Sequence, residues 1–529
     1  MEVLNSTSLA HRFSIKMENS WLVLAFSLLA VLVFLSKLTN HSSRQKKKLP
    51  PGPKPWPIIG NLNLLGSIPH QSLHLLAEKY GDLMCLKFGS KPVLIASSPE
   101  MAKLFLRTHD NVFASRPPTA SGKYTAYDYT DVTWAPYGPY WRHARRIYLN
   151  HIFNPKSLDS FEYLRVQERK AFLYGLYELS GKPFVLREHL SRYSVSSLSR
   201  MVMGNKYFSE TKVIRDESIC TLEKLQDMLD QWFLLNGVFN IGDWIPYLNR
   251  FDLQGYVKQM KELYKNFEIF NNHVLDDHLT KRNADKDNFI PKDMLDIILK
   301  IAEDPNLEIK LTRDNVKALL QELLVGGSDT SVTTVEWAMN ELLRHPHLIK
   351  KATEELDRVI GRDRWVEEGD YSKLPFIEAI IKETMRIHPL ATLLAPHYAI
   401  EDCNVAGYDV SEGTTVLINI WSMGRNPKYW DSPEEFLPER FLEKDIDVKG
   451  QNNFVLIPFG SGRRRCPGYT LGLRIVRATL ANLLHGFNWK LPPGMKPEDV
   501  CVEELYGLTT RPKISLSVIV EPRLPLHLY

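Results

Sequence analysis

The chain has 529 residues, of which 44% are hydrophobic and 24% are charged. This composition is typical of a globular protein and lacks the bias of a disordered or fibrous chain. The 66 basic and 62 acidic residues leave a formal charge of +4, which is too small to indicate binding to nucleic acid.

Five cysteines are spread along the chain, and no two of them form a CxxC pair. Their odd number and wide spacing argue against a disulfide framework or a zinc site, so we expect the body in a reducing compartment. Four of them are expected to be small buried hydrophobes, whereas Cys466 differs because of its neighbours. The five are Cys85, Cys220, Cys403, Cys466 and Cys501.

An uncharged apolar segment, WLVLAFSLLAVLVFL, covers residues 21–35. Extended to Leu38, it is long enough to cross a thin bilayer such as that of the endoplasmic reticulum. A cleaved signal peptide and a buried core helix are the alternatives. Both are disfavoured by RQKKKLPPGPKPWP, the basic and proline-rich sequence that follows. We therefore predict a single transmembrane anchor at residues 21–38.

The flanking charges orient this anchor. Basic residues are concentrated after the apolar segment, at residues 37–48, so the positive-inside rule places the following chain in the cytosol. Residues 1–20 then form a short lumenal tail, and Met17 is an alternative start that would make residues 1–16 optional. Residues 39–61 are basic and rich in proline, and we expect them to form an extended hinge.

Residues 62–529 contain no internal repeat, and we predict that they form one helix-rich unit. The longest predicted helix covers residues 312–344, with Thr312 as its N-cap and a stop before Pro346. A second predicted helix covers residues 374–388 and ends before a proline.

Strands are expected to be few and short, so the predicted fold class is mainly α with small β-sheets. One strand precedes a Ser-Pro helix start within residues 91–109. A strand hairpin with a glycine turn is predicted at residues 405–420, and a last strand lies within residues 512–525.

The stretch PFGSGRRRCPG, at residues 458–468, places a cysteine among arginines and glycines. Nearby cations favour the thiolate, which is the form of cysteine that binds metals. Glycines let a backbone approach a bulky group closely. The stretch therefore predicts that Cys466 is held as a thiolate against something large, such as a metal cofactor that carries negative groups.

The longest predicted helix contains GGSDTS in its middle, where each glycine costs ~1 kcal/mol relative to alanine. One interpretation is a helix crossing that needs small residues. The other is a bulge against a flat ligand, with Asp329 and Thr330 beside it to deliver protons into a dry pocket.

Two further patterns are weak when taken singly. Glu383 and Arg386 are three residues apart on one helix face, a spacing that is usually a surface ion pair. In WRHARR, Trp141 and Arg145 point the same way on a helix, although a solvated basic face is the ordinary meaning of such a segment.

Together and in this order, these patterns resemble the cytochrome P450 superfamily of heme-thiolate monooxygenases, in its microsomal plant A-type group. FGSGRRRCPG is similar to the heme-binding pattern, GGSDTS to the oxygen-activation motif, and LPPGPKPWPIIGN to the hinge. Glu383 and Arg386 match the family's Glu-x-x-Arg, to which PERF adds Arg440. The heme-binding pattern matches at Phe459, Gly462, Arg464, Cys466 and Gly468.

The resemblance implies a cytochrome P450 fold, preceded by one N-terminal transmembrane helix, and heme b as the cofactor. Cys466 would be the axial iron ligand, whose thiolate pushes electron density to the iron and favours O–O cleavage. Asp329 and Thr330 would be the catalytic acid–alcohol pair, and Glu383, Arg386 and Arg440 would be structural. The heme contacts would be Trp141, Arg145, His397, Phe459, Arg464 and Gly468.

The resemblance also implies partners. NADPH-cytochrome P450 reductase would supply electrons, with cytochrome b5 as a second donor, and O2 and a lipophilic small molecule would be the substrates. The protein is expected in the endoplasmic reticulum membrane, as a single-pass protein with its catalytic unit facing the cytosol. A basic patch for the acidic reductase would consist of Arg142, His143, Arg146, Arg463 and Arg465.

The branch that the chain resembles lies near the flavonoid B-ring hydroxylases and the homoterpene-forming oxidases, so phenolics and terpenoids are equally expected as substrates. Two alternatives stay open: a heme-thiolate isomerase or dehydratase that needs no reductase, and a heme-binding protein without turnover. The pocket is expected to draw on residues 113–134, 323–327, 390–395 and 506–510.

Overall fold

The computed structural model describes residues 27–28, 31, 47–210, 218–284, 289–451 and 453–529. The predicted anchor at residues 21–38 lies outside this range, apart from residues 27, 28 and 31. None of the helices within the described range is both long enough and apolar enough to cross a membrane. Residues 50–529 cluster as one unit.

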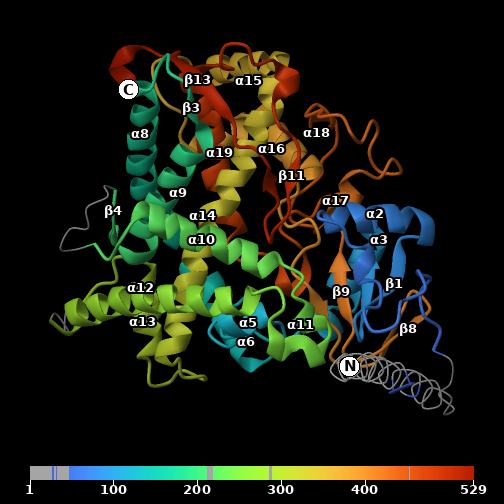
Figure 1. The fold of residues 1–529 in the computed structure, drawn as a ribbon. Helices are drawn as coiled ribbons and strands as arrows, with labels where there is room; N and C mark the ends of the chain where they lie inside the picture. Colours follow the sequence, from blue (N-terminus) through green and yellow to red (C-terminus); the bar gives the residue numbers. More distant parts are fainter. Residues whose placement is uncertain (1–26, 29–30, 32–46, 211–217, 285–288, 452) are drawn as a thin grey trace, which may run out of the picture. The chain divides into compact units, whose positions relative to one another are not determined.

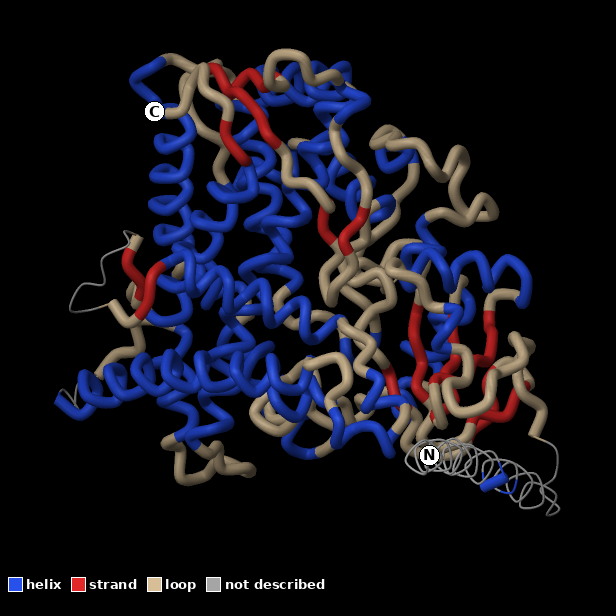
Figure 2. Tube along the Cα trace, in the orientation of Figure 1, coloured by secondary structure: helices blue, strands red, loops and turns tan. Residues whose placement is uncertain are grey.

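Helices make up most of this unit, and the longer strands gather beside them (Figure 2). The helices are α2 (Pro69–Tyr80), α3 (Pro99–Lys103), α4 (Asp110–Phe113), α5 (Ala120–Thr125), α6 (Pro139–Ile147), α7 (Pro155–Ser160), α8 (Glu162–Glu178), α9 (Leu186–Met203), α10 (Leu222–Gly237), α11 (Ile241–Trp244), α12 (Tyr256–Ala284), α13 (Met294–Ala302), α14 (Arg313–Arg344), α15 (Pro346–Val359), α16 (Pro375–Ile387), α17 (Ile420–Gly424), α18 (Arg440–Glu443) and α19 (Tyr469–Gly486).

The strands are short, as the sequence predicts. They are β1 (Leu83–Phe88), β2 (Lys91–Ala96), β3 (Phe184–Val185), β4 (Phe208–Ser209), β5 (Cys220–Thr221), β6 (His397–Tyr398), β7 (Cys403–Val405), β8 (Tyr408–Val410), β9 (Thr415–Ile418), β10 (Phe487–Lys490), β11 (Glu504–Leu505), β12 (Arg511–Pro512) and β13 (Ser517–Pro522).

The largest sheet has the order β1-β2-β9-β6 and lies to one side of the helices, with α2, α3 and α17 around it (Figure 1). β2 and β9 are parallel, whereas the two outer pairs are antiparallel. The main hydrophobic core lies among the helices, and two smaller cores lie around this sheet. A second sheet, β10-β13-β3, packs near the C-terminus.

The predicted long helix is confirmed as α14, which has 32 residues and is therefore about 48 Å long. Thr312 caps it: the Thr312 side chain accepts the Asn315 N–H, and the Asn315 side chain accepts the Thr312 N–H. Nearly every residue of α14 is buried, because it packs against α9, α16 and α19. A helix buried on most sides belongs to the centre of a core. A cavity lies beside α14, and Gly326 and Thr330 line it.

Other local predictions are confirmed, and one is wrong. The strand, the Ser98 cap and the helix within residues 91–109 are β2 and α3, and the helix within 374–388 is α16. The predicted hairpin at 405–420 pairs differently, because β8 pairs with β7, whereas β9 joins β2 and β6 in the largest sheet. The tight turn that makes the hairpin is Ala406–Gly407, where both φ angles are positive.

The cysteines are all unpaired, as expected. Only Cys220 is a buried hydrophobe, however, and Cys85, Cys403 and Cys501 are half-buried. Part of the predicted hinge also packs on the unit: the Cys85 N–H donates to the Pro51 carbonyl, and Gly60 bridges to Phe88.

Candidate functional site

A cavity of about 270 Å³ opens beside α14 and reaches the loop that precedes α19. Six residues predicted for the site line it: Arg145, Thr330, His397, Phe459, Arg464 and Cys466. Each of the four segments expected to form the pocket contributes as well. Their lining residues are Arg116, Val132, Thr133, Gly326, Leu390, Ala391, Leu394, Ala395 and Thr509.

The loop before α19 holds Cys466 at the cavity wall. The Cys466 N–H donates to the Phe459 carbonyl at 2.9 Å, which closes the loop. Gly462 lies in a short 3-10 turn with φ +66°, and a Cβ there would overlap the Leu106 carbonyl oxygen. Glycine is therefore required at 462 for both reasons, the left-handed backbone and the close approach.

The protonation of Cys466 does not follow from the neighbouring arginines alone. Burial raises the pKa of the Cys466 thiol, and the Gly468 backbone and Arg145 offset this only in part. The expectation that three adjacent arginines favour the Cys466 thiolate is thus too strong. Arg464 donates to the Ala114 carbonyl, and Arg463 pairs with Asp110. A bound metal ion deprotonates a coordinating thiol outright, so a thiolate at Cys466 would depend on the metal.

Three arginines face the cavity, and they donate to backbone carbonyls. Arg464 donates to the carbonyls of Ala114, Val132 and Ala135 at 2.5, 3.0 and 2.6 Å. Arg145 donates to Arg465 O at 2.6 Å. Arg116, which the sequence motifs did not single out, donates to the carbonyls of Thr133, Ala395 and Pro396.

Within the part of the chain that the structure describes, none of these three arginines forms an ion pair with a carboxylate. Burial lowers the pKa of Arg116 and of Arg145 to about 10, and burial together with Arg116 holds the pKa of Arg464 well below its usual range. The nearby Asp131 carboxyl opposes this lowering of the pKa of Arg116 and Arg464. Because the arginines bond only neutral carbonyls directly among the described residues, the arrangement suits a ligand that carries carboxylates.

Three predicted contacts differ from expectation. The Trp141 indole N–H donates to the Val132 carbonyl at 3.0 Å, and Trp141 does not line the cavity, nor does Gly468. His397 bonds the Phe113 carbonyl through Nδ1 at 2.9 Å, while burial and Arg116 hold its pKa well below the ordinary value. In this neutral state Nε2 accepts, so a donor role toward a carboxylate requires a different protonation state.

The two glycines of α14 face different neighbours, one a packed helix and the other the cavity. A Cβ at Gly327 would lie 2.8 Å from Leu198 of α9, so this glycine serves a helix crossing. Gly326 lines the cavity, and a Cβ there would meet no atom within 4 Å, which leaves room for a flat ligand. The helix is continuous here, so the expected bulge is absent from α14 as described.

Asp329 and Thr330 both lie at the site but point in different directions. Thr330 lines the cavity and donates to the Gly326 carbonyl at 2.9 Å. Asp329 does not line it. Its carboxylate pairs with Arg187 on one side and accepts from the Thr509 hydroxyl at 2.8 Å on the other. Thr509 does line the cavity, so the hydroxyl bonded to Asp329 is Thr509 and not Thr330.

Comparisons with known proteins agree with this geometry. The Cytochrome P450 family model matches residues 50–518. A trimethyltridecatetraene synthase of Zea mays is 43% identical over 525 residues, 95% of this chain and 94% of its own length. A flavonoid 3'-monooxygenase of Petunia hybrida is 43% identical over 487 residues, 91% and 93% of the two chains.

The chain belongs to the cytochrome P450 family. A zebra fish cytochrome P450 structure with abiraterone aligns at a TM-score of 0.72 with 26% identity, covering 87% of this chain and 100% of that one. This cytochrome P450 is accordingly a monooxygenase that uses heme b. The resemblance predicted from the sequence is confirmed, as is its plant branch.

The cavity of this P450 fits heme. A thiol, an open wall at Gly326 and three arginines without ion pairs supply what an iron porphyrin with two propionates needs. Cys466 would hold the iron, while Arg116, Arg145 and Arg464 would hold the propionates. Gly472, on α19, also lines the cavity, and a Cβ there would meet no atom within 4 Å.

Away from the cavity, the predicted structural trio is assembled. Arg386 donates to both oxygens of Glu383 at 2.7 Å, and the Glu383 Oε1 also accepts from Arg440 at 3.1 Å. The side chains of Glu383 and Arg386 are 0% exposed. The pair is therefore not the surface ion pair that its spacing usually means.

The predicted basic patch is only partly present. Arg142, Arg146 and Arg463 are exposed, and Arg465 is half-buried above the Tyr469 ring. His143 is buried, and burial lowers its pKa, so it belongs to the core and not to a surface patch.

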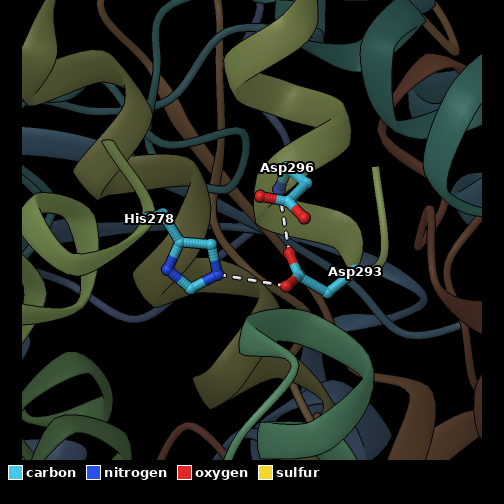
Figure 3. Close-up of side chains that lie close together, drawn as sticks. All are labelled: His278, Asp293 and Asp296. Atoms are coloured by element: carbon cyan, nitrogen blue, oxygen red, sulfur yellow. Dashed lines mark hydrogen bonds and ion pairs between the residues drawn. The ribbon is translucent and has the colours of Figure 1, made fainter. Parts of the chain in front are cut away.

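A second polar cluster is formed by His278, Asp293 and Asp296 (Figure 3). His278 of α12 bonds Asp293 at 3.0 Å, and Asp293 accepts the Asp296 N–H at the start of α13. One ligand atom of each residue lies within 4.8 Å of the others, which is a spacing that metals use. Each group already has a protein partner, however, and Asp293 is the N-cap of α13. We interpret the cluster as a charged helix cap.

Proposed function

We propose that this P450 inserts one oxygen atom of O2 into a lipophilic phenolic or terpenoid molecule. The electrons come from NADPH through cytochrome P450 reductase, with cytochrome b5 as a second donor. The observation that carries the proposal is a single cavity lined by both the Cys466 thiol and the Thr330 hydroxyl. Heme, when bound there, supplies the oxygen-activating chemistry.

Residues of the chain itself bind the cofactor and position protons at the cavity. Cys466 binds the iron, and the three cavity arginines orient the cofactor through its propionates. The Thr330 hydroxyl holds a proton or a water at the cavity, and Thr509 links the cavity to Asp329. Positioned groups of this kind transfer protons to or from a reacting group.

The lining chemistry supports a lipophilic substrate with few charges. Its side chains in the segment after α16 are apolar, namely Leu390, Ala391 and Leu394. Its hydroxyls come from Thr133, Thr330, Ser331, Thr334, Ser461 and Thr509. Relatives named for flavonoid hydroxylation and for trimethyltridecatetraene and dimethylnonatriene synthesis support both compound classes.

The decisive experiment combines the purified protein with reductase, NADPH and O2. Candidate flavonoids and terpenoid alcohols are first titrated against the heme absorption spectrum, and those that shift it are then incubated and their products identified. We expect an oxygenated product that requires NADPH. A product formed without reductase would favour the isomerase or dehydratase alternative, and spectral binding without any product would favour a non-catalytic heme protein.

We further propose that residues 21–38 anchor the protein in the endoplasmic reticulum membrane, with the catalytic unit in the cytosol. The basic excess that follows the apolar segment supports this orientation. Deleting residues 1–48 should move the protein from the membrane pellet toward the soluble fraction while heme binding persists. Loss of heme binding in that variant would mean that the segment belongs to the core.

A further inference from the structure

Among the described residues that line the cavity, one carboxyl group has no part in the motifs or in the proposed reaction: that of Glu322. It lies on α14, eight residues before Thr330, which places it about 12 Å along the same helix. Burial raises the pKa of Glu322, while its hydrogen-bond donors oppose that shift. An acid in such a position needs a reason, because burying a carboxyl group is costly unless it is well bonded.

The Glu322 carboxyl binds the segment Val132–Thr133 from one side. Its Oε2 accepts the Val132 N–H at 2.8 Å, and its Oε1 accepts the Thr133 hydroxyl at 2.6 Å. The Tyr148 hydroxyl, 3.2 Å from Oε2, also bonds it. One side chain of α14 thus holds the polar donors of a loop that has no regular secondary structure.

The backbone carbonyls of Val132 and Thr133 accept hydrogen bonds from side chains at the part of the cavity where heme would bind. The Val132 carbonyl accepts from Trp141 Nε1 and from Arg464 Nη1, both at 3.0 Å. The Thr133 carbonyl accepts from Arg116 Nε at 2.9 Å. A two-residue segment therefore connects Glu322 to two of the three arginines that face the cavity.

We propose that Glu322 is a positioning residue for the heme cradle. By holding Val132–Thr133, it keeps their carbonyls where they direct Arg116, Arg464 and Trp141 to the edge of the cavity. A carboxylate suits this role because it accepts from all three donors at once, whereas an amide would turn an N–H toward one of them. The proposal rests on heme as the cofactor and is independent of the substrate or the electron donor.

The test measures heme retention directly. Holoenzyme variants are mixed with excess apomyoglobin, and the rate of heme transfer is followed by absorption, without reductase or substrate. We expect Glu322→Gln to lose heme about tenfold faster than the parent, which corresponds to ~1.4 kcal/mol. Thr133→Val, which removes the hydroxyl at similar volume, should also accelerate the loss of heme. Thr133→Ser, which keeps the hydroxyl, should lose heme at the parent rate.

A matched control separates positioning from general stability. Glu355 is also a buried carboxyl that accepts backbone N–H groups, those of Phe376 and Ile377, but it lies away from the cavity. Glu355→Gln should lower the denaturation midpoint while heme transfer keeps the parent rate.

Equal heme-transfer rates in Glu322→Gln and the parent, or equal acceleration in Glu322→Gln and Glu355→Gln, would overturn the proposal. If Glu322→Gln does not fold, the Thr133 pair decides: identical rates for Thr133→Val, Thr133→Ser and the parent would refute it. Because turnover is not measured, failure of the proposed reaction cannot be mistaken for failure of this inference.

Discussion

Two groups of buried arginines show how differently one side chain is used in this molecule. Arg386 is fully buried, binds both oxygens of Glu383 and donates to three further carbonyls. Arg464 is also largely buried, but within the described chain its hydrogen-bond partners are neutral carbonyls. Arg386 therefore has a charged partner within the protein, whereas the partners of Arg464 among the described residues are neutral, which leaves its charge available to an anionic cofactor.

This contrast separates residues that hold the fold from residues that hold heme. Breaking a self-sufficient ion pair should cost stability whether or not heme is bound, because a buried charge is left alone. Removing a group from the cavity should instead change the cofactor and leave the fold comparatively intact. The predictions below test this separation, beginning with the largest expected effect.

Cys466→Ser should abolish the absorption band of the reduced carbon-monoxide complex. A serine hydroxyl does not replace a thiolate as a soft, anionic iron ligand. Circular dichroism should show an unchanged helix content, because the loop is closed by backbone bonds and not by the thiol. Cys403→Ser, in β7, is the matched control and should keep a normal band; a normal band in Cys466→Ser would disprove the ligand assignment.

Arg386→Ala should lower the free energy of unfolding by about 3–5 kcal/mol, because it removes the two-point ion pair of the buried Glu383 carboxylate, which keeps only the longer bond from Arg440 as an ion pair. Denaturant titration followed by circular dichroism measures this loss. Arg477→Ala, which breaks a partly exposed pair with Glu378, should cost about 1 kcal/mol or less. Equal costs for the two variants would mean that the buried trio has no special structural weight.

Arg464→Gln should accelerate heme transfer to apomyoglobin and cost less unfolding free energy than Arg386→Ala. The reason is that Arg464 bonds neutral carbonyls, so its removal leaves no buried carboxylate without an ion-pair partner. A stability loss as large as that of Arg386→Ala would remove the distinction between the two arginine groups.

Thr330→Ala should reduce product formed per NADPH by about a factor of ten, with hydrogen peroxide taking up the difference. The change removes a hydroxyl from the cavity, and positioned proton donors typically contribute ~10²–10⁴-fold. Thr509→Val is its companion, since Thr509 is the hydroxyl that bonds Asp329. If both variants match the parent in coupling and rate, neither hydroxyl delivers protons.

His278→Gln should have the smallest effect, visible only in the pH dependence of stability. Burial lowers the pKa of His278, but the bonded Asp293 carboxylate outweighs it, so the folded-state pKa is raised. The stabilisation is therefore fully present below the unfolded pKa of about 6.5 and is lost as the pH rises through the folded value. The variant should lack this loss, whereas the exposed control His347→Gln should retain it.

Much of the local structure could be predicted because its signals lie within a few residues. Thr312 and Asn315 form the cap of α14, and Ser98 with Pro99 starts α3. The predicted hairpin at 405–420 was wrong because its pairing depends on distant segments: β9 pairs with β2 and β6. Alternation of apolar and polar residues predicts a strand but not the strand with which it pairs. Glu322 and Arg116 went unnoticed, although a lone acid within the apolar run ALLQELLVGG was a signal.

The sequence by itself determined the family, the heme-binding loop and the caps of the long helix, because these depend on residue types at short spacings. Only the tertiary structure decided where the charges point. Asp329 meets Arg187 and Thr509, which lie 142 and 180 residues away, and not its neighbour Thr330. Glu322 meets Thr133 across 189 residues. The physical reason is that hydrogen-bond partners and burial, which set pKa values and side-chain direction, come from segments that only folding brings together.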